Sequence, residues 1–169
     1  RLYFQNDITI PNINEIHSDN AESIDILIES EVSNLLESIL GIDLFEELKE
    51  HLDDNNELKE DAPIKWQRLV YGHTYESNNK RYRYKGLLEK GKDVRKSLLA
   101  DYVFVKWLKG NVTQSTGVGQ VIVNAKNAMN VNPSQKLVAI WNRFYNKLNG
   151  NDERNRARLS FINCTPFVD

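Results

Sequence analysis

The chain contains little cysteine, few glycines and prolines, and no long apolar run. Cys164 is the only cysteine among 169 residues, so no disulfide forms within the chain, which fits a reducing compartment such as the cytoplasm. The most apolar stretch, residues 102–108, includes Lys106 and is far shorter than the roughly 20 residues of a membrane-spanning helix. No basic segment followed by an apolar one resembles a secretion signal. We therefore expect a soluble, non-secreted protein without a membrane partner.

Motifs for cofactors and calcium are also missing. The glycines in residues 117–119 lack the third glycine and the preceding strand of a dinucleotide-binding fingerprint. Asp53, Asn55 and Glu57 resemble the start of a calcium loop, but Leu58 stands where that loop requires glycine. These two segments therefore predict ordinary loops.

One pair of residues has the spacing of metal ligands. Glu47 and His51 are four residues apart on one face of a predicted helix. A surface ion pair is the favoured interpretation, and a small metal-dependent enzyme is the remaining one. Cys164 has no histidine neighbour and is interpreted as a packing residue. We predict no catalytic, cofactor-binding or metal-binding residues, and no enzymatic activity.

Charge is distributed very unevenly along the chain. Residues 1–61 carry 17 acidic and 3 basic side chains, whereas residues 62–169 carry 7 acidic and 19 basic ones. The net charge of −2 is therefore the sum of −14 and +12. Two interpretations stay open: the acidic and basic parts pair within one chain, or they pair between neighbouring copies in a head-to-tail assembly.

Apolar residues recur at helical spacing in several segments, which predicts a mainly α fold. The expected helices run from Asn20 or Ser23 to Leu40, over residues 44–52 after an Asp43 cap, over residues 64–71, from Gly86 or Asp93 to Lys109, and from Pro133 to residue 149. The expected helix ends are Gly41, Gly72, Gly110 and Gly150. The expected core consists of Leu35, Leu36, Leu99, Val103, Trp107, Leu137, Trp141 and Phe144.

The segments between these helices predict long loops and terminal arms. Residues 73–85 are expected to form a loop or a short β-ribbon, and residues 113–119 a flexible loop. Residues 1–5 resemble the end of a protease-cleavage tag, whereas residues 2–10 are rich in strand formers, and both interpretations stay open. We expect a compact bundle of about five helices in residues 1–150, and a C-terminal arm or strand in residues 151–169 that packs on the domain or on a neighbour.

Two basic clusters are the candidate interface residues. The first consists of Lys80, Arg81, Arg83 and Lys85, with Tyr82 and Tyr84 between them. The second consists of Arg154, Arg156 and Arg158. Both suit an acidic protein neighbour. Residues 80–85 also suit DNA, because lysine and arginine neutralise phosphates and tyrosines could stack on bases. A solvated loop anchored by two tyrosines is the plainer interpretation of that segment.

The order of motifs along the chain resembles a known family. The motifs are LLESILGIDLFEEL at residues 35–48, KWQRLVYG at 65–72, YKGL at 84–87, the aromatic helix at 98–108, Thr116-Gly117, and Trp141-Asn142. This order, over most of residues 22–149, resembles the head–tail connector (adaptor) proteins of tailed bacteriophages, especially those of crAss-like phages of Bacteroides. The resemblance implies a virion structural protein without catalytic residues.

The resemblance further implies a ring, typically twelve-fold, that joins the portal protein to the tail around the DNA channel. Its expected partners are further copies of the chain, the portal, and the tail or other ring proteins, with DNA nearby in the channel. The expected location is the neck of a virion assembled in the host cytoplasm. The alternative is a DNA-binding regulatory or packaging accessory protein that uses the basic residues 80–85.

Overall fold

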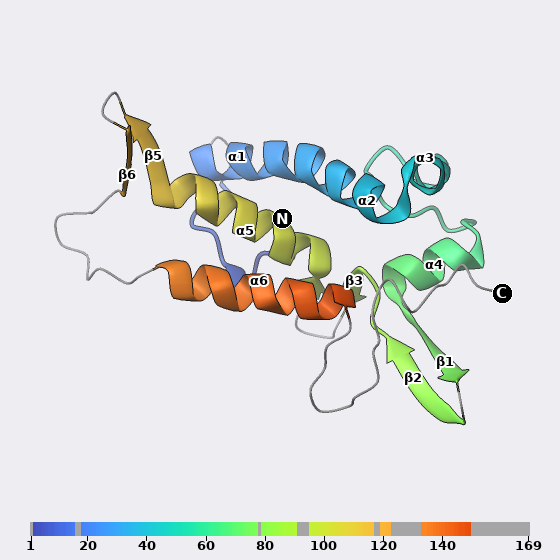
Figure 1. The fold of residues 1–169 in the computed structure, drawn as a ribbon. Helices are drawn as coiled ribbons and strands as arrows, with labels where there is room; N and C mark the ends of the chain where they lie inside the picture. The colour runs from blue at the N-terminus through green and yellow to red at the C-terminus, as the bar shows by residue number, and fades with distance from the viewer. Residues whose placement is uncertain are drawn as a thin grey trace.

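The body of the molecule consists of three helical rods that lie side by side (Figure 1). The computed structural model describes residues 2–15, 18–77, 79–90, 95–116, 119–122 and 133–149. The first rod comprises α1 (Asp19–Leu27), the π-helical segment η2 (Ile28–Val32) and α2 (Ser33–Leu40) in direct succession. The rod α5 (Leu98–Val112) packs between this first rod and α6 (Pro133–Asn149). The predicted mainly α fold is confirmed.

Two shorter helices follow the first rod near the end of α2 (Figure 1). They are α3 (Ile42–Glu50) and α4 (Ile64–Tyr71). The bounds predicted for α4 are confirmed, because Pro63 precedes its first residue and Gly72, at φ 83°, ends it. Gly41 ends α2 as predicted, but it also precedes α3 directly, so the predicted Asp43 cap is wrong.

The strands form three antiparallel two-stranded ribbons within the described residues. The strands are β1 (His73–Ser77) with β2 (Lys80–Tyr84), β3 (Leu88–Lys90) with β4 (Arg95–Ser97), and β5 (Thr113–Thr116) with β6 (Gly119–Ile122). The ribbon predicted for residues 73–85 is therefore present. The loop predicted for residues 113–119 is wrong for the described part, because the threonines there favour an extended chain. The β1–β2 and β5–β6 ribbons project at opposite ends of the molecule (Figure 1).

The first and fifth helices begin at residues other than those predicted. Ser18 caps α1 by accepting a hydrogen bond from the backbone N–H of Ala21 at 3.1 Å, so Asn20 and Ser23 lie within the helix. Ser97 caps α5 by accepting bonds from the N–H groups of Leu99 and Ala100, at 3.1 and 3.2 Å. The described residues between Gly86 and Ser97 are not helical, because they pair as β3 and β4.

The end of α5 also differs from the prediction. The helix continues past Gly110 to Val112. The side-chain amide of Asn111 donates a hydrogen bond to the carbonyl oxygen of Trp107, one turn earlier in the helix, at 2.9 Å. Glycine at position 110 therefore does not end the helix. Gly150 lies outside the described residues.

Two hydrophobic clusters make up the core. Cluster one joins α2, α3, α4 and the base of β2, and consists of Leu36, Phe45, Leu48, Trp66, Leu69, Tyr84, Leu87, Leu98 and Phe144. Cluster two joins the N-terminal segment, α1, α5 and α6, and consists of Phe4, Ile8, Ile10, Ile13, Ile24, Ala100, Val103, Phe104, Val105 and Ile140. Because α5 and α6 contribute to both clusters, they connect the two ends of the molecule.

The predicted core is confirmed in part. Leu36, Val103 and Phe144 are buried, and four more of the predicted residues are half-buried against the clusters: Leu35, Leu99, Trp107 and Leu137. Trp141 is 41% exposed, so its assignment to the core is wrong. Adjacent residues of a helix point about 100° apart. Because Ile140 and Phe144 of α6 face the core, Trp141 lies at the edge of the buried face of that helix.

The N-terminal segment packs as part of the core rather than as a strand or an extended arm. Residues 6–8 form a short 3₁₀ helix, and no strand includes residues 2–10. Phe4, Ile8 and Ile10 are buried in cluster two. The predicted C-terminal arm, residues 151–169, lies outside the described residues.

Candidate assembly interface

The β1–β2 ribbon presents one basic face to solvent. Its register places Thr74 opposite Arg83 and Glu76 opposite Arg81. Alternate residues of a strand point to opposite faces, so these four side chains share one face of the ribbon. All four are exposed. The outer face of the ribbon therefore carries two arginines and one carboxylate among these four residues.

The opposite face anchors the ribbon to the body. Tyr84 is 7% exposed, and its hydroxyl donates a hydrogen bond to the carbonyl oxygen of Leu69 at 3.2 Å. The ring of His73 lies 5.5 Å from that of Tyr75 and 6.1 Å from that of Tyr84. Burial, together with the charge of Arg68, lowers the pKa of His73. Tyr84 is therefore an anchor, and the prediction that it could stack on DNA bases is wrong.

The base of the ribbon is a close contact between two glycines. Gly72 and Gly86 have φ angles of 83° and 82°. A Cβ at Gly72 would lie 2.3 Å from the carbonyl oxygen of Tyr84, and one at Gly86 would lie 2.5 Å from the carbonyl oxygen of Val70. Only glycine permits this approach of backbone to backbone. The contact fixes the ribbon relative to α4.

The predicted interface residues are brought together only in part. Arg81 and Arg83 are exposed, and neither has an ion-pair partner among the described residues. Lys85, next to the ribbon, pairs with Glu89 at 3.5 Å. The side chain of Lys80 and the second cluster of Arg154, Arg156 and Arg158 lie outside the described part of the chain. Among the described side chains, Arg81 and Arg83 are thus the free cations of the ribbon.

Intramolecular ion pairs neutralise some of the acidic side chains of residues 1–61. Lys65 pairs with Glu47, Lys106 with Glu31 at 3.0 Å, and Arg143 with Asp7. Many carboxylates of the first rod, α3 and the 51–61 connection are exposed and have no ion-pair partner in the described ranges: Asp19, Glu22, Glu29, Glu37, Asp43, Glu50, Asp54, Glu57, Glu60 and Asp61. Pairing within the chain is therefore real but incomplete, and an acidic surface remains.

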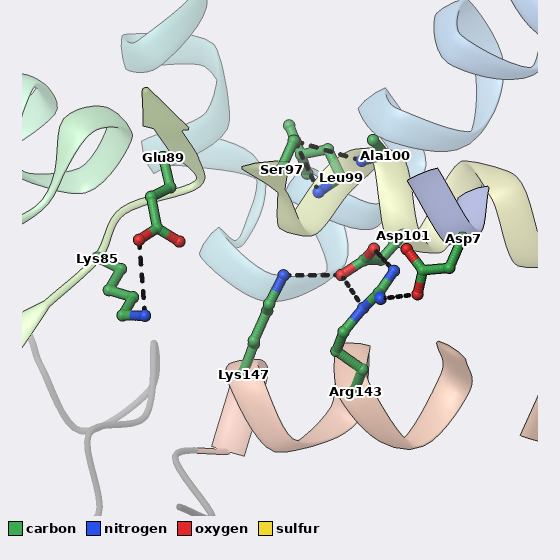
Figure 2. Close-up of polar contacts among 9 residues, drawn as sticks. All are labelled: Asp7, Lys85, Glu89, Ser97, Leu99, Ala100, Asp101, Arg143 and Lys147. Atoms are coloured by element: carbon green, nitrogen blue, oxygen red, sulfur yellow. Dashed lines mark hydrogen bonds and ion pairs between the residues drawn. The ribbon is translucent and has the colours of Figure 1, made fainter. Parts of the chain in front are cut away.

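The most deeply buried charged group of the described residues lies between α5 and α6 (Figure 2). The side chain of Asp101 is 3% exposed, and Arg143 binds it through both carboxylate oxygens, with Nε 3.1 Å from Oδ2. Lys147 donates to the same Oδ2 at 2.8 Å, and Arg143 also reaches Asp7. Sequence reasoning did not identify this network. Its only signal was an aspartate in an apolar stretch together with two cations four residues apart on α6.

A second exposed surface follows α6. After Lys136, the exposed residues described in this helix are all uncharged: Val138, Ala139, Trp141, Asn142, Tyr145 and Asn146. Val138 and Tyr145 are each 53% exposed. Depletion of charge with enrichment of tryptophan and tyrosine is typical of the centre of protein–protein interfaces. This α6 face therefore has the composition of a protein contact surface.

Replacing Trp141 with alanine tests that interpretation. We expect the free energy of unfolding to fall by about 1–2 kcal/mol, compared with about 3–5 kcal/mol for a fully buried tryptophan. Assembly should weaken far more, because truncating an aromatic hot spot costs about 2 kcal/mol or more of binding free energy. Urea denaturation and sedimentation measure the two effects. Gln135→Ala, at an exposed position of the same helix before this face begins, is the matched control and should leave assembly unchanged. A loss of more than about 3 kcal/mol in the free energy of unfolding would show that Trp141 is a core residue.

Glu47 and Asp53, two of the candidate metal ligands, have structural partners. Glu47 pairs with Lys65 rather than with His51, and hydrogen bonding from Lys65 lowers the pKa of Glu47. Asp53 accepts hydrogen bonds from the N–H groups of Asn55 and Glu57, both at 2.9 Å, which forms a tight turn. Across the described residues, no group of three or more His, Cys, Asp or Glu is placed to hold a metal ion.

No protein-family model, no curated protein and no solved structure matches this chain. Within the described ranges, no helix combines the length and apolar composition that crossing a bilayer requires.

Proposed function

We propose that the chain is a virion structural protein, a ring-forming head–tail connector subunit that joins the portal to the tail around the DNA channel. The observation that carries the proposal is the separation of unpaired charge: free arginines on the β1–β2 ribbon, and free carboxylates on α1, α2 and α3. A ring subunit needs two different faces, because a contact repeated by rotation joins unlike surfaces. The resemblance in residues 22–149 to phage connectors supports the same assignment.

The partners in this proposal are further copies of the chain, typically twelve, together with the portal protein and the tail or other ring proteins. The uncharged α6 face supplies an additional surface for one of these partners. DNA passes nearby in the channel, and the location is the virion neck, assembled in the host cytoplasm. The chain performs no catalysis in this role.

Electron microscopy of the virion that contains the chain is the direct test. We expect a closed ring at the neck, between portal and tail, whose density accommodates the three helical rods. Localisation to the capsid shell, to the tail fibres or outside the particle would contradict the proposal.

Reversing the free charges of the ribbon tests its role in assembly. We expect Arg81→Glu with Arg83→Glu to fold normally, because exposed substitutions usually change stability by less than about 0.5 kcal/mol each. Incorporation into portal–connector complexes should fall by orders of magnitude, because like charges facing across an interface cost several kcal/mol. Lys85 is left unchanged because it pairs with Glu89.

The matched control makes the same change of charge on another ribbon. Arg95 and Lys96 of β4 are exposed, and Arg95→Glu with Lys96→Glu should assemble like the unmodified chain. Normal assembly of the folded Arg81→Glu, Arg83→Glu variant would show that the ribbon is no assembly surface. An equal loss of assembly in both variants would show that assembly responds only to the net charge of the chain.

A DNA-binding regulatory or packaging accessory protein is the second candidate, because Arg81 and Arg83 are exposed and free to neutralise phosphates. The burial of Tyr84 removes one of the two stacking residues on which that interpretation relied. Affinity of the isolated chain for duplex DNA, measured over a series of salt concentrations, distinguishes the candidates. Tight binding that weakens steeply with salt favours the DNA-binding role.

A further inference from the structure

A shallow groove of about 540 Å³ runs between α1 and the second half of α5. Its apolar part consists of Ile26, Leu27 and Trp107, and Ile26 is 66% exposed. Asp19 and Glu22 line the same groove. An apolar surface with carboxylates beside it suits a side chain with an aliphatic stem and a cationic end.

The charge of this groove is negative. Among the described lining residues the one lysine, Lys106, is paired with Glu31 at 3.0 Å, and Tyr102 donates a hydrogen bond to the same carboxylate oxygen at 3.2 Å. Asp19 and Glu22 are exposed, and among the described residues no cation lies within ion-pair distance of either. Two carboxylates are therefore free to pair with a ligand from outside the chain.

We propose that this groove receives strand β2 of a second copy of the chain, with Arg81 and Arg83 paired to Asp19 and Glu22. Arg81 and Arg83 are two residues apart on a strand, which places them about 6.5 Å apart. Asp19 and Glu22 are three residues apart on a helix, where Cβ atoms lie about 5–6 Å apart. The two spacings match within the reach of the side chains, and Trp107 offers an aromatic face near the bound guanidinium groups.

The positions of the two surfaces explain why the occupant is another copy. The start of α1 and the β1–β2 ribbon lie at opposite ends of the molecule (Figure 1). The ribbon cannot fold back onto its own groove, because the glycine contact at Gly72 and Gly86 fixes it against α4. A contact from one end of a copy to the other end of the next is the kind that generates rings. This assignment rests on the proposed function and adds the identity of the two joined surfaces.

A charge-exchange experiment tests the pairing. Asp19→Lys with Glu22→Lys should weaken self-association by roughly 100-fold or more, and Arg81→Glu with Arg83→Glu should do the same. Combining all four substitutions in one chain should restore association, because the charges are then exchanged across the same contact. Sedimentation over a series of concentrations measures each constant, and urea denaturation verifies that each variant folds.

A covalent trap provides a second measurement with a different readout. A chain carrying Ile26→Cys, Arg83→Cys and Cys164→Ser should form a ladder of disulfide-linked oligomers under mild oxidation, whereas chains with only one introduced cysteine should stop at dimers. If the Asp19→Lys, Glu22→Lys variant associates normally while the Arg81→Glu, Arg83→Glu variant does not, the groove is not the receptor, although the ribbon remains an assembly surface. If the ladder forms but microscopy finds no ring at the neck, the pairing stands and the proposed function fails. If no disulfide-linked ladder forms and the variant with all four substitutions does not regain association, the proposed pairing is wrong.

Discussion

Replacing Gly72 with alanine is expected to lower the free energy of unfolding by about 2–6 kcal/mol, because backbone strain and a steric clash add together. A non-glycine residue at φ 83° and ψ 169° is strained, which costs about 1–3 kcal/mol. The new Cβ would also lie 2.3 Å from the carbonyl oxygen of Tyr84, and such overpacking adds about 1–3 kcal/mol. The groups it meets are backbone atoms, so no side-chain rotation relieves the clash.

Gly41 provides the matched control for this experiment. Its φ and ψ angles, 82° and 164°, are nearly those of Gly72, but nothing lies within 4 Å of the position that a Cβ would take there. Gly41→Ala should therefore show the strain of about 1–3 kcal/mol without the clash. Urea denaturation of both variants measures the difference. Equal losses would mean that the backbone of the ribbon shifts easily and that the glycine contact does not hold it.

Removing both cations that contact Asp101 should be comparably damaging. Arg143→Met with Lys147→Met keeps the apolar stems of both side chains but leaves a carboxylate that is 3% exposed without a partner. Breaking a buried ion pair by removing one side costs about 3–5 kcal/mol. We expect a loss of that size in the free energy of unfolding, measured by urea denaturation at neutral pH.

Two further variants separate burial of charge from loss of packing. Adding Asp101→Asn to the double variant should recover most of the loss, because the buried charge is then gone. Asp7→Asn, which removes only the exposed partner of Arg143, should cost at most about 1 kcal/mol. A failure of Asp101→Asn to recover stability would show that the stems of Arg143 and Lys147, and not their charges, support this junction.

Local signals explain which helices were predictable from the sequence. Pro63 and Gly72 delimit α4, and Pro133 begins α6, because each of these residues restricts or permits backbone angles by itself. Ser97 was missed as a helix cap because the residues before it belong to a ribbon whose pairing no local pattern specifies. Likewise, the glycine contact at Gly72 and Gly86 joins backbones 14 residues apart, and only the folded chain brings them together.

The candidate interface was predictable as composition but not as geometry. The sequence indicates that residues 80–85 are basic, yet only the register shows that Arg81 and Arg83 share a face that Tyr84 does not. The assignment of Trp141 failed for a related reason. A helical stripe of Leu137, Trp141, Phe144 and Leu148 is broad, and the position of α5 decides which part of it is covered.

The π-helical segment η2 has a consequence for changes in chain length. Residues on either side of it serve different clusters, since Ile24 packs into cluster two and Leu36 into cluster one. A π-helical turn holds one extra residue within a full turn, so deleting one residue between 28 and 32 would shorten it to an ordinary turn and leave α2 in nearly the same orientation relative to α1. Ile24 and Leu36 would then both stay in their clusters. A related sequence that lacks a residue here can therefore keep its apolar stripe on the same face of α2, and an alignment that closes this gap elsewhere would equate residues that point in different directions.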